Sequence, residues 1–154
     1  MKPLRIYFAH PMCEYGTELE KEVIERIKEA DIDEIRGVDD IEIVNPSDPK
    51  ILREFKAFGK KNAMHMKFFL DLVRTCDVIV GMPFLNGQWG AGVYAEMKVM
   101  QEKCGSVWQV EWYWDDDGSP YFCLERVNVE DIRPLSITET RQTVKMVKHY
   151  KGGE

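Results

Sequence analysis

A glycine-rich segment that leads into a single acid is the first feature of the chain that could do chemistry. The stretch PFLNGQWGAGVYAEMKVM, residues 83–100, follows the most apolar short run, DVIVGM at 77–82. Gly90 and Gly92 flank one small residue, and Glu96 follows four positions later. Glycines at a helix start leave backbone amides open to an anion, and a carboxylate just beyond them can act as a nucleophile. The structural alternative is a tight turn followed by an acid that the helix dipole stabilises.

Polar residues also follow two other apolar runs. LRIYFA at 4–9 leads into His10, and IEIVNP at 41–46 ends near Asn45 and Asp48. A histidine in this position is a candidate ligand for a substrate, with an ordinary surface role as the alternative. Helix capping alone explains Asp48, but it does not explain an asparagine at the end of a strand.

Two further side chains are candidates because they are titratable or aromatic. His65 lies one turn before Phe69, on the expected core side of a helix. Trp89, beside Gly90, could stack on a base or a sugar. Burial in the hydrophobic core is an equal alternative for both side chains.

The elements that must position these residues alternate between strands and helices. This order predicts one α/β domain over residues 1–154, with a mainly parallel, doubly wound sheet of the flavodoxin or Rossmann-like type, about five strands and helices on both faces. The predicted strands are 4–9, 41–46, 77–82, 106–114 and 121–127, the last two forming a hairpin. The predicted helices begin near Thr17, Asp48, Asn62, Gly90 and Ser136.

Local signals mark some of these helix boundaries. Thr17 with Glu20 and Ser136 with Glu139 both match the capping-box pattern. Gly59 is expected to interrupt the helix that Asp48 caps. Because ligands bind beyond the carboxyl ends of parallel strands, we expect the three strand-tip loops to bring Glu96, His10 and Asn45 to one cleft.

Composition excludes several classes of protein. The 154 residues carry a formal net charge of −6, which argues against a nucleic-acid polymer as partner because phosphate contacts need a basic face. The four cysteines form no C-x-x-C pair and lack histidines at ligand spacing, so we expect reduced thiols, no metal and a cytoplasmic location. No segment has the length of a membrane span, and no membrane partner is expected.

Three segments together resemble the nucleoside 2-deoxyribosyltransferase family and the related nucleoside and nucleotide N-glycosidases. They are RIYFAHPM at 5–12, IVNPSD at 43–48 and CDVIVGMPFLNGQWGAGVYAE at 76–96, and the resemblance covers about residues 4 to 110. In that family a glutamate early in the helix after the third strand attacks the anomeric carbon and forms a glycosyl-enzyme intermediate. Glu96 matches that glutamate.

The resemblance implies a substrate, roles for further residues and an assembly. The substrate would be a nucleoside or a nucleoside monophosphate, with no cofactor. Tyr7 and His10 would lie by the sugar or base, Asn45 and Asp48 would shape the base pocket, and the amides of Gly90 and Gly92 would hold a hydroxyl or a 5′-phosphate. Relatives often complete the site with a neighbouring subunit, so a homodimer or larger assembly is expected.

Two alternatives belong to other functional classes. The first is a nucleotide-binding or sensing module without catalysis, in which Glu96 is structural. This alternative is favoured because Phe69 occupies the position at which the family carries an aspartate before the third strand. The nearest acid, Asp71, is expected to face solvent. The second is a protein-interaction domain that uses the aromatic strand 106–114 as a sheet edge.

Overall fold

The computed structural model describes residues 2–29, 40–61 and 65–152, which contain a five-stranded sheet. Its strand order is β2-β1-β3-β4-β5. The pairs β2–β1, β1–β3 and β3–β4 are parallel, whereas β5 is antiparallel to β4. The predicted α/β fold with a mainly parallel sheet is therefore confirmed, with one antiparallel pair at the edge. The strands are β1 Leu4–Ala9, β2 Ile41–Val44, β3 Val78–Gly81, β4 Ser106–Trp114 and β5 Pro120–Arg126.

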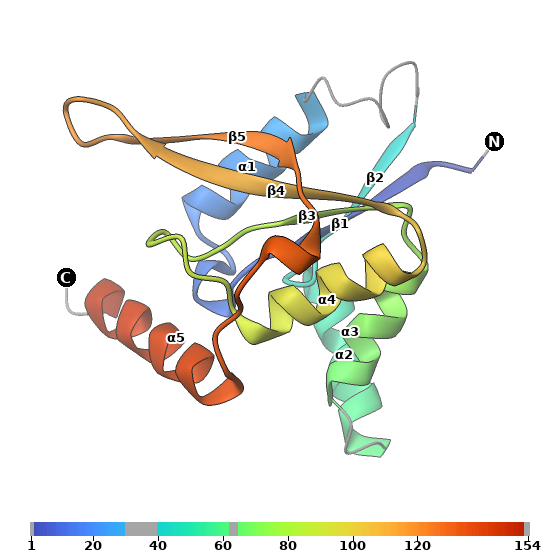
Figure 1. Cartoon of the computed structure of the whole chain (residues 1–154). Helices are drawn as coiled ribbons and strands as arrows, with labels where there is room; N and C mark the ends of the chain where they lie inside the picture. Colours follow the sequence, from blue (N-terminus) through green and yellow to red (C-terminus); the bar gives the residue numbers. More distant parts are fainter. Residues whose placement is uncertain (1, 30–39, 62–64, 153–154) are drawn as a thin grey trace.

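Helices lie on both sides of this sheet (Figure 1). α1 covers one face, α3 and α4 pack against the other, and α5 lies beside α4 and the short helix η1. No helix in the described ranges is long and apolar enough to span a lipid bilayer. The helices are α1 Glu18–Glu29, α2 Pro49–Lys61, α3 His65–Arg74, α4 Ala91–Glu102 and α5 Ile137–Gly152, with the 3₁₀ helices η1 Met12–Glu14 and η2 Val129–Asp131.

The alternation of side chains along β1 shows how the sheet is packed. Ile6 and Phe8 point into the cluster that contains Val23 of α1. Tyr7 belongs to the opposite cluster, together with Met97 of α4. A central strand that is buried on both faces places every second residue in each core. β1 can therefore direct Tyr7 towards α4 without losing its contacts with α1.

Two local predictions are wrong. Gly59 does not interrupt its helix, since α2 runs on to Lys61. A glycine inside a helix costs roughly 0.5–1 kcal/mol, and packing can offset that cost. Phe55, one turn earlier, stacks on Phe69 of α3 with ring centroids 4.7 Å apart.

The aromatic strand 106–114 is not a sheet edge either, because β4 pairs with β3 on one side and with β5 on the other.

The two capping boxes behave differently. At α5 both reciprocal bonds form, from the Glu139 amide to the Ser136 hydroxyl and from the Ser136 amide to the Glu139 carboxylate. At α1 the Glu20 amide bonds to the Thr17 hydroxyl at 3.2 Å, but the Glu20 carboxylate has other partners. The first box therefore fixes the helix start while leaving its acid available to the strand-tip loops.

Candidate active site

A cavity of about 380 Å³ lies beyond the carboxyl ends of β1 and β3. Its walls are mostly apolar, and its titratable groups come from α4, α5, the end of β1 and the loop that follows it. Parallel strands of an α/β sheet place ligand sites at this end. The lining residues are His10, Pro11, Met12, Tyr15, Met66, Phe69, Phe84, Gly90, Gly92, Val93, Glu96, Thr140, Arg141, Val144 and Lys145.

Glu96 lines this cavity from the second turn of α4. The residue is only 8% exposed, and the hydroxyl of Tyr7 donates a hydrogen bond to its Oε2 atom. Tyr7 is fully buried in the centre of the sheet, where its register with Ile79 of β3 holds it in place. The rigid sheet therefore orients the carboxyl group of Glu96 through a single hydrogen bond.

Burial changes the acidity of the groups around this carboxyl. Removal from water raises the pKa of Glu96 to about 8, although the hydrogen bond from Tyr7 acts in the opposite direction. Burial, followed by the charge of Glu96, raises the pKa of Tyr7 well above its usual value. Tyr7 is therefore a hydrogen-bond donor at neutral pH, and Glu96 of the free protein is largely protonated at pH 7.

His10 forms part of the cavity wall, where both of its ring nitrogens are engaged. Nδ1 lies 3.0 Å from the carbonyl oxygen of Phe8, and Nε2 lies 2.7 Å from Oε2 of Glu20. The imidazole also stacks on the Phe8 ring at a centroid distance of 4.1 Å. These contacts hold the imidazole ring in one orientation at the end of β1.

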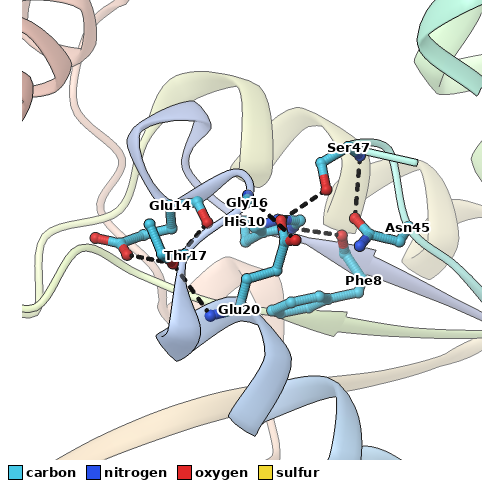
Figure 2. Close-up of polar contacts among 8 residues, drawn as sticks. All are labelled: Phe8, His10, Glu14, Gly16, Thr17, Glu20, Asn45 and Ser47. Carbon is cyan, nitrogen blue, oxygen red and sulfur yellow. Dashed lines mark hydrogen bonds and ion pairs between the residues drawn. The ribbon is translucent and has the colours of Figure 1, made fainter. Parts of the chain in front are cut away.

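Glu20 joins the β1–α1 loop to the β2–α2 loop. Figure 2 shows its carboxylate between His10 and Ser47, whose hydroxyl donates to Oε2 at 2.7 Å, while the Gly16 amide donates to Oε1 at 3.2 Å. Burial by itself would raise the pKa of Glu20, but hydrogen bonds from His10 and Ser47 outweigh it and lower the pKa. Glu20 is thus an ionised, 6% exposed carboxylate that holds two of the three strand-tip loops together.

The start of α4 is capped by another helix. Gly90 is the N-cap residue and offers no side-chain cap, so the Ala91 amide donates to the Thr140 hydroxyl of α5 at 2.9 Å. A Cβ atom at Gly90 would lie 3.3 Å from the Thr140 methyl group, whereas one at Gly92 would meet nothing within 4 Å. Both glycines line the cavity, and the space at Gly92 is open to a ligand.

Asn45 and Asp48, which we expected at the cleft, do not line the cavity. The side chain of Asn45 accepts a hydrogen bond from the Ser47 amide at 3.0 Å, and that of Asp48 accepts one from the Lys50 amide at 2.9 Å. The expectation that Asn45 converges with Glu96 is therefore wrong: an Asx turn satisfies its side-chain oxygen locally. Asp48 caps α2, which is the structural role that the sequence offered as the alternative.

The expected roles of Trp89 and His65 at the site have different outcomes. Trp89 packs against the core beside α4, and its carbonyl oxygen accepts a hydrogen bond from the Leu135 amide at 2.8 Å. It lies on a separate groove and not on the cavity with Glu96, so its expected stacking role there is not supported by its position. His65 begins α3, but its side chain lies outside the described part of the chain.

Several residues at the site were not identified from the sequence, namely Tyr15, Glu20, Phe84, Arg141 and Lys145. For Glu20 a signal was present, because it lies one turn before Val23 on the buried face of α1, where an unpaired acid would be costly. No comparable signal places α5 beside α4, since that contact is tertiary.

The arrangement combines a buried carboxyl, a tyrosine that donates to it and an apolar cavity. Such a carboxyl can form a covalent bond to an electrophilic carbon or stabilise a cation next to it. Among the described residues, no three histidine, cysteine or acidic side chains are grouped as metal ligands.

No protein-family model matches the chain. A search of curated proteins likewise finds no significant match.

Proposed function

We propose that the protein cleaves or transfers the N-glycosidic bond of a nucleoside or nucleoside monophosphate, on a doubly wound, Rossmann-like fold, with Glu96 as the nucleophile. The observation that carries the proposal is the position of Glu96, a buried acid that lines a cavity large enough for a small ligand. A carboxyl group with a raised pKa in a cleft is a common property of functional sites.

The hydrogen bonding of Glu96 supports this role. Tyr7 engages Oε2, while Oε1 has no hydrogen-bond partner among the described residues. One oxygen is thus held and the other is available to a ligand. A carboxylate oriented in this way can approach an anomeric carbon from a fixed direction, which is the main requirement for covalent catalysis by proximity.

The proposed reaction has two steps. In the first, Oε1 of ionised Glu96 forms a bond to the anomeric carbon while the carbon–nitrogen bond breaks, and the base leaves with the electron pair and takes a proton from solvent. In the second, water or another base attacks the same carbon, releases the carboxylate of Glu96 and loses a proton. Low polarity around Glu96 strengthens its interaction with the positive charge that develops at the sugar.

The test is base release from a panel of nucleosides and nucleoside 5′-monophosphates, measured by chromatography. Glu96→Gln should abolish release and retain ligand binding, because the amide keeps the size of the carboxyl but cannot act as an anionic nucleophile. Glu102→Gln is the matched control, since Glu102 lies exposed on the same helix. Wild-type turnover by Glu96→Gln would refute the mechanism.

A nucleotide-binding module without catalysis is the second candidate. It is favoured by one observation: Glu96 is the only carboxylate among the described residues that line the cavity. Glycosidases commonly use a second acid to protonate the leaving group. Asp71, the nearest acid to the family position, is on the surface and pairs with Lys67 and Arg74. This candidate predicts that nucleotides bind equally to wild type and Glu96→Gln without release of base.

A further inference from the structure

Arg141 and Lys145 form a pair of cations on the wall of the cavity that also contains Glu96. They are four positions apart on α5, so both side chains project from one face of that helix. Neither forms an ion pair with an acid in the described ranges. Both residues are exposed, so their charges are accessible to an anionic ligand in the cavity.

The helix segment that carries these cations is held against the start of α4. The Thr140 hydroxyl, next to Arg141 in the chain, accepts the hydrogen bond from the Ala91 amide. Gly92, one residue further along α4, leaves open space on the same cavity. At 1.5 Å per residue, Gly92 lies about 6 Å along the helix axis from Glu96. The same cavity is thus lined by the carboxyl group of Glu96, the open start of α4 and the two cations of α5.

We propose that Arg141 and Lys145 bind a phosphate group of the ligand, so that the substrate is a nucleoside 5′-monophosphate and not a free nucleoside. The inference rests on the proposed function for the nucleoside part of the ligand, but the cation pair itself requires only an anion. Arginine and lysine both recognise phosphate, and the N-terminus of α4 favours the same charge. The reacting carbon would lie near Glu96, and the anionic group would lie near α5.

Sugar phosphates test this without knowledge of the base. Calorimetry would compare ribose 5-phosphate and 2-deoxyribose 5-phosphate with the two free sugars and with inorganic phosphate. We expect both sugar phosphates to bind the wild type more tightly than either free sugar, and the double variant Arg141→Gln/Lys145→Gln to bind them at least about tenfold more weakly. Tighter binding of inorganic phosphate than of the sugar phosphates would indicate an anion site that does not recognise substrate, and would overturn the inference.

Two further double variants serve as controls. Arg53→Gln/Lys98→Gln removes the same charge from exposed positions outside the cavity and should leave binding unchanged. Arg141→Lys/Lys145→Arg keeps the charge and should retain most of the affinity, which separates charge from any effect on folding. An equal loss in the Arg53/Lys98 variant, or unchanged binding in the Arg141/Lys145 glutamine variant, would overturn the assignment.

The inference and the proposed function can fail separately. Sugar-phosphate binding that depends on α5, without release of base from any nucleotide, would support the phosphate site and contradict glycosidic cleavage. Release of base from nucleosides and nucleotides with equal kcat/KM, unaffected by the Arg141/Lys145 variant, would support cleavage and contradict the phosphate site.

Discussion

The hydroxyl of Tyr7 donates its hydrogen bond to Glu96 across 89 positions of the sequence, from an interior strand of the sheet to a helix that covers it. Because Tyr7 is fully buried and its own pKa is raised, it remains a donor over the neutral range. Glu96 therefore has one oxygen held by the sheet, and its acidity depends on a residue that does not itself line the cavity.

The first prediction concerns the pH dependence of base release. If the ionised carboxylate of Glu96 attacks the sugar, kcat/KM should rise about tenfold per pH unit and level off near pH 8, because burial raises the pKa of Glu96 to about 8. Tyr7→Phe removes the hydrogen bond that lowers this pKa, so the rising limb should move to higher pH. Tyr113→Phe is the control, because the Tyr113 hydroxyl donates to Glu125 on the β4–β5 hairpin. A rate that falls as pH rises through 8 would instead identify Glu96 as a proton donor.

The second prediction concerns stability. The folded state holds the proton of Glu96 up to about pH 8, whereas the unfolded chain loses it near 4.5, so this group lowers the free energy of unfolding as pH rises between those values. Glu96→Gln removes this pH dependence. Its size in the free energy of unfolding is at most roughly 1.4 kcal/mol per unit of difference between the folded and the unfolded pKa of Glu96. The Tm of Glu96→Gln minus that of the wild type should therefore increase from pH 5 to pH 8 and then stay constant. A difference that is flat across this range, as expected for Glu102→Gln, would show that Glu96 is not protonated in the fold.

The third prediction concerns the carboxylate that links the two loops. Glu20→Gln should destabilise the protein by about 3–5 kcal/mol, because it leaves His10 without its charged partner in a buried position. The pKa of Glu20 is lowered in the fold, so its contribution is present above the unfolded value and is lost as the pH falls through the folded pKa. Urea unfolding at pH 7 and pH 3 should give a smaller difference between variant and wild type at the lower pH. Glu18→Gln, on the exposed side of α1, should change stability by less than about 1 kcal/mol.

The fourth prediction uses the open space at Gly92. A valine there would meet no protein atom with its Cβ and should be tolerated by the fold, but it would occupy part of the cavity. Binding of nucleotides should fall far more than binding of nucleosides if phosphate lies at the start of α4. Gly92→Ala is the size control, since it improves helix propensity by up to about 1 kcal/mol and adds little volume. Equal losses for nucleosides and nucleotides would exclude a phosphate at this helix start.

The sequence predicted the strands and most helices because their signals are local. Apolar runs and caps depend on neighbouring residues, and the carboxyl-end rule placed His10 and Glu96 on one cavity. Glu20 was interpreted as a capping-box acid because that pattern lies within four residues, whereas its partners His10 and Ser47 are 10 and 27 positions away.

The remaining differences between the sequence predictions and the structure have two origins, one local and one tertiary. Asn45 satisfies its side chain two residues away, which no strand-tip rule anticipates. Trp89 pairs its backbone with the segment before α5 through a bridge to Pro134, so its position depends on a contact over more than forty residues. The docking of α5 brings Arg141 and Lys145 to the cavity and could not be deduced from periodicity within the helix.

The shared cap between α4 and α5 has a consequence for how this protein can vary. Gly90 leaves the Ala91 amide to Thr140, and a Cβ at position 90 would lie 3.3 Å from the Thr140 methyl group. A larger residue at 90 therefore calls for a smaller one at 140, and serine keeps the hydroxyl while removing that methyl. In related chains that share this geometry, positions 90 and 140 should change together although 49 positions separate Ala91 from its cap.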